Sequence, residues 1–131
     1  MELKCVDTSF LVDAEHDEAL RRILHRETFV VPAIAAAEFL LGVRLVKNEG
    51  IRQRAQTFYE DYIRPFVFPF DEAQAQTLAT LIATQRRKGR VLKPYDAGIA
   101  AAALELRCPI FAVDSDFDGI DGLDVIKLSQ L

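Results

Sequence analysis

The apolar residues of this chain recur with two different spacings. Short runs rich in apolar and β-branched residues predict strands or extended segments at residues 3–7, 28–31, 66–70, 109–113 and 124–127. Longer stretches with helical spacing of their apolar positions predict helices at residues 15–27, 32–47, 51–63, 72–88 and 94–107. Strands that alternate with helices are typical of an α/β fold in which helices cover both faces of a parallel sheet.

Residues at the ends of these elements support the proposed boundaries. Pro32 suits the first turn of a helix, and the Asn-Glu-Gly segment at 48–50 ends that helix. Pro65 disfavours helical geometry at the residue before it, and Asp71 can cap the helix that follows. No repeat or linker divides the 131 residues, so we expect a single domain over residues 1–131. In such folds, sites form beyond the carboxyl ends of the strands.

The composition is that of a globular protein. Half of the residues are hydrophobic, 27% are charged and the net charge is −4, which argues against a protein that coats DNA non-specifically. The longest stretch without a charge, residues 73–85, is well short of the ~20 apolar residues of a spanning helix. The N-terminus lacks a signal-peptide core, and Cys5 and Cys108 show no metal-binding spacing. We therefore expect a cytoplasmic protein with two free core thiols and no membrane association.

Carboxylates interrupt several runs that the pattern places in the core. Asp7 closes the first apolar strand, and Asp96 opens the small, apolar helix 97–104. Glu38 has only apolar or small neighbours three and four positions away on its helix, so its side chain emerges from the core-facing stripe. Asp114 ends the strand 109–113, and Asp116 follows two residues later. These acids are candidates for one shared site at the edge of the sheet.

A divalent cation is the simplest explanation for such a cluster. A lone buried carboxylate costs several kcal/mol, and apart from Lys4 these runs hold no basic residue to pair with one. Oxygen-only ligands suit Mg²⁺ or Mn²⁺, and such a site matches phosphodiester hydrolysis by metal-activated water. Taken singly, each acid has another explanation: Asp7 could cap a helix, Asp96 could favour a helix start, and Asp114 and Asp116 could be loop residues.

The same residues resemble the motifs of PIN-domain nucleases. The resemblance rests, in chain order, on Val6-Asp7-Thr8-Ser9, on the helix that contains Glu38-Phe39-Leu40-Leu41-Gly42, on Tyr95-Asp96-Ala97-Gly98-Ile99-Ala100-Ala101, and on Val113-Asp114-Ser115-Asp116-Phe117. It covers nearly the whole chain. Within the family, the length and spacing look like the VapC-type toxins of bacterial and archaeal toxin–antitoxin pairs.

This resemblance implies a three-layer α/β/α fold with a central, mainly parallel sheet of about five strands. It implies an acidic pocket that binds Mg²⁺ or Mn²⁺ and cleaves RNA, with Asp7, Glu38, Asp96 and Asp114 as catalytic and metal-binding acids and Asp116 as an additional ligand. Ser9 matches a hydroxyl that often supports the first Asp in the family, and a helix-start role is the alternative. A VapC-type toxin also implies an antitoxin partner and a homodimer.

A basic segment lies just before Asp96. It contains five of the chain's 16 basic residues within eight positions, namely Arg86, Arg87, Lys88, Arg90 and Lys93. Such a strip beside an acidic metal pocket could hold the phosphates of RNA. A solvated helix end, where cations are favoured, is the alternative.

Other functions fit the sequence less well. Segment 114–119 matches the first half of a calcium-binding EF-hand loop, but Val125 stands where the motif requires Glu. A phosphatase of the haloacid-dehalogenase type needs an Asp two places after Asp7, and Ser9 occupies that place. A non-catalytic PIN-like module that binds RNA or protein is the remaining alternative. Such modules usually lose one or more of the acids, and this chain keeps all of them.

Overall fold

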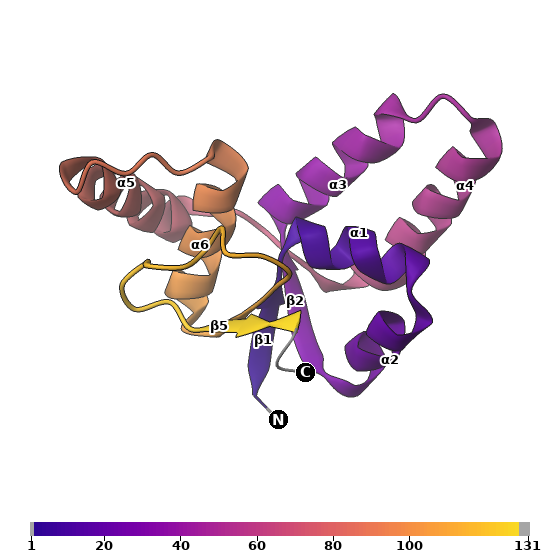
Figure 1. Ribbon diagram of the computed structural model, residues 1–131, viewed down its shortest axis with the longest axis horizontal. Helices are drawn as coiled ribbons and strands as arrows, with labels where there is room; N and C mark the ends of the chain where they lie inside the picture. The colour runs from indigo at the N-terminus through magenta and orange to yellow at the C-terminus, as the bar shows by residue number, and fades with distance from the viewer. Residues whose placement is uncertain (1, 129–131) are drawn as a thin grey trace.

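The computed structural model, which describes residues 2–128, contains one five-stranded parallel sheet (Figure 1). Its strands lie in the order β3-β2-β1-β4-β5, and every neighbouring pair is parallel. The strands are β1 (Leu3–Val6), β2 (Thr28–Pro32), β3 (Val67–Phe68), β4 (Ile110–Ala112) and β5 (Val125–Lys127). The predicted α/β class with a parallel sheet is confirmed.

Six α-helices cover the two faces of the sheet. Figure 1 shows α5 and α6 on the left of the strands, with α1 to α4 on the right. The helices are α1 (Thr8–His16), α2 (Glu18–Arg26), α3 (Ala33–Leu45), α4 (Glu49–Phe58), α5 (Glu72–Arg87) and α6 (Pro94–Leu106). This arrangement gives the three layers that the sequence predicts. None of the helices within residues 2–128 is long and apolar enough to cross a membrane.

The core joins the middle strands to the helices on both faces. Phe10 of α1 stacks on Phe111 of β4 with ring centroids 5.4 Å apart, and both side chains are fully buried. On the other face, Ile99 of α6 is also fully buried. Gly98 lets α6 approach α3 closely, because a Cβ at this position would lie 3.1 Å from side-chain carbons of Ile34. The fold therefore holds the start of α6 beside α3.

One predicted helix, residues 15–27, is two helices in the structure. Residues 15 and 16 belong to α1, a helix that the sequence analysis missed, and α2 begins only after Asp17. Asp17 caps α2 by accepting a hydrogen bond from the backbone N–H of Ala19 at 2.9 Å. Helix α1 is only nine residues long and carries polar residues beside its buried Phe10, so its apolar stripe is weak.

Two further boundaries differ from the prediction. Helix α3 ends at Leu45, before Asn48. Asn48 instead caps α4 by accepting a hydrogen bond from the Ile51 N–H at 3.0 Å, so α4 begins at Glu49. The predicted helix 51–63 changes to a π-helical turn over Tyr59–Ile63, and a 3₁₀ turn over Arg64–Phe66 contains Pro65. The strand expected over residues 66–70 is correspondingly short, limited to Val67–Phe68.

Candidate active site

A cavity of about 520 Å³ lies where β1 and β4 end and α1, α3 and α6 approach one another. All five acids singled out in the sequence line it, together with a sixth that the sequence analysis did not single out: Asp7, Glu38, Asp96, Asp114, Asp116 and Asp13. Ser9, the predicted supporting hydroxyl, lines it as well and is half-buried. The topology therefore brings residues from four distant parts of the sequence to one place.

Asp7 sits at the buried end of the cavity. It directly follows β1, and its carboxylate accepts a hydrogen bond from the backbone N–H of Phe10 at 2.9 Å, which caps α1. Only 3% of the residue is exposed. Burial raises the pKa of Asp7 to about 7, the Phe10 N–H opposes this shift, and the charges of Asp114, Asp96 and Asp116 add to it. Asp7 therefore caps α1 and also lines the cavity.

Asp96 and Glu38 face the cavity from two helices. Asp96 lies in the first turn of α6, and Glu38 lies midway along α3; both are half-buried. The pKa of Asp96 is raised to about 6, mainly by burial and then by the charges of Asp116 and Glu38, while Lys93 acts in the opposite direction. The charge of Glu38 is one cause of the shift at Asp96, so α3 and α6 present like charges at the same cavity.

Asp114 and Asp116 belong to the loop after β4. The backbone N–H of Asp116 donates to the Asp114 carboxylate at 3.0 Å, which fixes the turn. Partial desolvation at the edge of the cavity raises the pKa of Asp116, and the neighbouring Asp114 carboxylate raises it as well. Both residues are exposed, so they form the open rim of the cavity while Asp7 forms its floor.

The cavity carries a large excess of negative charge. Among the described residues that line it, Lys93 is the only cation opposite six carboxylates. Lys4, the one basic residue within the predicted buried runs, pairs instead with Glu27 at 2.8 Å. The raised pKa values of Asp7, Asp96 and Asp116 are the expected consequence of like charges held together in a partly desolvated site.

The side chains present fit a divalent cation with hard-ligand preference. The donors are carboxylate oxygens and hydroxyls, without cysteine or histidine, which suits Mg²⁺ or Mn²⁺. Thr8 also lines the cavity, and its hydroxyl is buried without a hydrogen-bond partner. No three acidic, histidine or cysteine side chains within residues 2–128 already enclose a metal position. Mg²⁺ usually keeps several waters and needs only one or two carboxylates, so an open cavity of this kind suits a hydrated ion.

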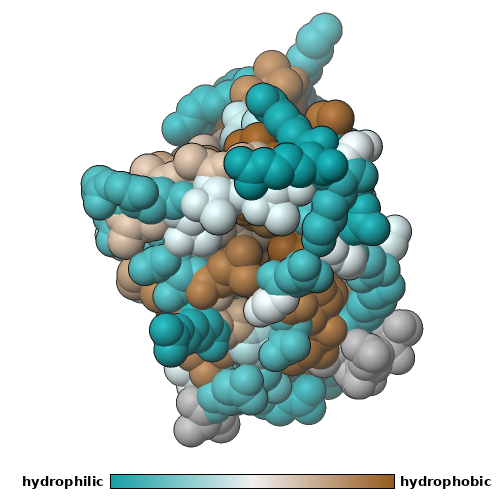
Figure 2. Space-filling model, turned by 90° about the vertical axis from the view of Figure 1, so that its left-hand side faces the viewer, coloured by the Kyte–Doolittle hydropathy of each residue, from teal (hydrophilic) through white to brown (hydrophobic). Residues whose placement is uncertain are grey.

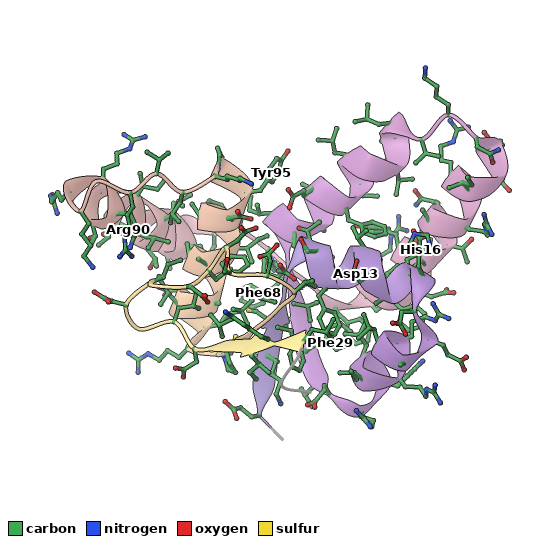
Figure 3. All side chains as sticks on the ribbon, viewed as in Figure 1. Asp13, His16, Phe29, Phe68, Arg90 and Tyr95 are labelled. Atoms are coloured by element: carbon green, nitrogen blue, oxygen red, sulfur yellow. The ribbon has the colours of Figure 1, made fainter. Side chains whose placement is uncertain are left out.

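Asp13 was missed because the helix that carries it was missed. Asp13 lies on α1 (Figure 3), in the turn after Ser9. Both residues line the cavity. A sign was present in the sequence: Asp7 as a cap, followed by apolar residues at positions 10, 11 and 14, is the pattern of a short helix. Positions 9 and 13, four apart, then share one face of that helix.

The predicted basic strip does not lie together at the cavity. Lys93 lines it, but Lys88 pairs with Asp121 at 3.0 Å and Arg90 donates to the Gly119 carbonyl at 3.0 Å. Figure 3 shows Arg90 beside α5, well away from Asp13. Arg86 and Arg87 are exposed in the last turn of α5. Two of the five cations therefore contact the loop after β4, and a phosphate-binding role of the five stays a prediction.

Comparisons with known proteins agree with this fold. Residues 4–123 match the family described as PIN domain. A curated relative, "Ribonuclease VapC" of Rickettsia bellii (strain RML369-C), is 28% identical over 128 residues and covers 94% of each chain. Similar solved structures include VapBC2 of Rickettsia felis bound to a promoter DNA fragment, with a TM-score of 0.83, 17% identity and coverage of 95% of this chain and 98% of that one.

Two further solved structures have the same fold. DNA-bound VapBC of Salmonella typhimurium matches with a TM-score of 0.83 and 18% identity over 97% of this chain and 98% of that one. FitAcB of Neisseria gonorrhoeae matches with a TM-score of 0.80 and 23% identity over 98% and 99% of the two chains.

Proposed function

The chain belongs to the PIN domain family, and on this basis we propose that it is a Mg²⁺- or Mn²⁺-dependent endoribonuclease of the VapC toxin type. The observation that carries the proposal is the cavity at the end of β1 and β4, where six carboxylates face a single lysine. The similarity to a ribonuclease over nearly the full length of both chains supports RNA as the substrate.

In this proposal, the role of each acid in binding the cation follows from its position in the cavity. Asp7, Glu38, Asp96 and Asp114 hold the cation, with Asp116 at the rim as a further ligand. Ser9 and the unpartnered Thr8 hydroxyl orient the first of these acids or a water molecule. A bound divalent cation supplies Lewis-acid activation of water and stabilises charge at the scissile phosphate. Lys93, which lines the same cavity, holds a phosphate oxygen of the RNA.

We also propose an antitoxin partner, because the similar structures are VapBC and FitAB complexes. An apolar groove of about 230 Å³ between α1, α3 and α4 shares Val12 and Glu38 with the acidic cavity. Val12 and Ile51, which line this groove, are exposed apolar side chains. A partner segment with an apolar face that ends in a basic residue would fill the groove and reach the acids.

The homodimer is likewise a proposal. Figure 2 shows the left-hand side of Figure 1, where α5 lies, and apolar side chains show at the centre of this face among hydrophilic ones. Phe70 and Val91, before and after α5 in the sequence, are exposed apolar residues. A second copy of the chain would remove such surface from water.

The test is cleavage by purified protein freed of any antitoxin. Short RNA oligomers and total RNA are incubated with Mg²⁺ or Mn²⁺, and in parallel with excess EDTA. We expect cleavage that requires the metal and returns when the metal is restored. Cleavage that survives chelation would contradict the proposed mechanism, and RNA binding without cleavage under all conditions would favour the non-catalytic module.

Lys93 and Lys88 provide a matched pair for the RNA contact. Lys93→Ala is expected to weaken RNA binding about three- to tenfold and to flatten its salt dependence by about 0.7 in log–log slope, as one lost phosphate contact should. Lys88→Ala is expected to change binding less than about twofold, because Lys88 is engaged with Asp121. Fluorescence anisotropy of a labelled oligomer over a salt series measures both. Equal effects of Lys93→Ala and Lys88→Ala on RNA binding would indicate that Lys93 is a solvated surface charge without a phosphate contact of its own.

A further inference from the structure

The two cysteines of the chain lie against each other inside the fold. The Sγ atoms of Cys5 and Cys108 are 3.1 Å apart, although the residues are 103 positions apart in the sequence. Both are free thiols. Cys5 is completely buried and Cys108 is 7% exposed, so Cys108 is the less deeply buried of the two. The expectation of two free core thiols is confirmed, but nothing in the sequence indicates that they touch.

The backbone holds this pair in place from both sides. Cys5 lies within β1, and its N–H donates to the carbonyl of Pro109 at 2.8 Å. Cys108 lies in the turn between α6 and β4, where its N–H donates to the Ala103 carbonyl at 3.1 Å. These hydrogen bonds hold strand β1 and the turn before β4 beside each other, and the sulfur atoms need to approach by only about 1 Å to reach the roughly 2.05 Å of a disulfide.

We propose that Cys5 and Cys108 form an oxidisable dithiol, which a peroxide converts into an intramolecular disulfide that ties β1 to the turn before β4. The inference does not depend on the proposed nuclease function. Cys5 precedes Asp7 by two residues, so the tie would form in the strand that leads into the acidic cavity.

The chemistry balances with one hydrogen peroxide per pair. The Cys108 sulfur, as thiolate, attacks one peroxide oxygen; the O–O bond breaks, hydroxide leaves and takes up a proton as water, and Cys108 becomes a sulfenic acid. The Cys5 sulfur then attacks the Cys108 sulfur. The S–S bond forms, the S–O bond breaks, and the departing hydroxide leaves as water with the proton of the Cys5 thiol. The two sulfurs together lose two electrons, which the peroxide gains.

Peptide mapping tests this proposal directly. The folded, reduced protein is treated with hydrogen peroxide in native buffer, quenched with N-ethylmaleimide and digested with trypsin. Because Lys4 and Arg107 directly precede the cysteines, each cysteine begins its own tryptic peptide, residues 5–21 and 108–127. We expect these two peptides linked to each other, a monomer lighter by the mass of two hydrogen atoms, and a thiol count that falls from two to zero. The melting temperature should rise by about 10 °C, since the bridge closes a long loop.

Cys5→Ser and Cys108→Ser are the matched controls, and neither should give the linked peptides or the rise in melting temperature. If a variant fails to fold by circular dichroism, the mapping of the wild-type protein still decides the question. Retention of both thiols after oxidation, a disulfide between two chains, or a sulfinic acid on Cys108 beside a free Cys5 would each overturn the proposal. Dithiothreitol should restore the original mass and melting temperature.

Discussion

Asp7→Asn is expected to stabilise the metal-free protein at pH 8 while abolishing RNA cleavage. Burial raises the pKa of Asp7 from its ordinary value of 3.8 to about 7. At pH 8 the folded protein therefore bears the cost of a buried, ionised carboxylate, which amounts to about 4 kcal/mol at most by linkage. Asn removes the charge and keeps an oxygen that can cap α1. We expect a gain of about 2–4 kcal/mol in the free energy of unfolding, or roughly 10 °C in melting temperature.

The gain should depend on pH in a defined direction. The folded pKa of Asp7 lies above its unfolded value, so between about pH 4 and pH 7 the folded state holds a proton that the unfolded state has lost. The contribution of this residue to stability is thus largest below pH 4 and is lost as the pH rises through 7. The difference between Asp7→Asn and wild type should be smallest below pH 4, grow by at most about 1.4 kcal/mol per pH unit up to pH 7, and be largest at pH 8, as measured by urea denaturation in EDTA.

Asp71→Asn is the matched control for this substitution. Asp71 caps α5 by accepting from the Gln74 N–H at 2.9 Å, the same geometry as Asp7 with Phe10, but it is exposed and outside the cavity. It should change stability by less than about 1 kcal/mol. Millimolar Mn²⁺ should raise the melting temperature of wild type at pH 8 and of Asp71→Asn, but not of Asp7→Asn. A destabilised Asp7→Asn protein at pH 8 would mean that the cap outweighs the charge.

Asp96→Asn is expected to lower kcat for RNA cleavage by about 10³-fold, since a metal contributes several kcal/mol and each 1.36 kcal/mol is tenfold in rate. The side chain faces the cavity from the first turn of α6, and Asn keeps its shape while losing the charge. Circular dichroism should show an unchanged fold, because the lost helix-dipole interaction is offset by relief of repulsion from Asp116 and Glu38.

Glu105→Gln on the same helix is the control for Asp96→Asn. Glu105 is exposed and accepts a hydrogen bond from the Thr77 hydroxyl at 2.8 Å, an interaction that Gln can retain. Its cleavage rate should stay within about twofold of wild type, as is usual for a surface change. Cleavage by Asp96→Asn at the wild-type rate would remove this acid from the metal site.

The sequence predicted the site better than it predicted the helices around it. Asp7, Glu38 and Asp96 interrupt apolar patterns, and topology alone carries such residues to the carboxyl edge of a parallel sheet. Helix α1 was not predicted, because a nine-residue helix with polar residues on its cavity face shows little periodicity in its apolar positions. Asp13 was lost with it. Functional polar residues weaken the very pattern by which a short helix is recognised.

The pattern of hydrophobic and polar positions does not predict contacts between segments that are distant in the sequence. The cations of segment 86–93 cannot be told apart by their sequence pattern, yet only Lys93 among them lines the cavity. Lys88 pairs with Asp121, and Arg90 donates to the carbonyl of Gly119. The partners come from the loop after β4, which has no periodicity to predict. The proximity of Cys5 to Cys108 likewise depends on the pairing of β1 with β4. Such pairings are set by tertiary packing, which a single sequence does not show.

The carboxylates around this cavity are expected to bind a divalent cation together. The most direct measurement is a crystal of the protein grown with Mn²⁺, with an anomalous difference map recorded at the manganese edge. We expect a peak in the cavity, with oxygens of Asp7 and Asp96 coordinating the Mn²⁺ ion directly or through water. A cavity without a peak at saturating Mn²⁺, with these carboxylates turned apart or paired with Lys93, would contradict it.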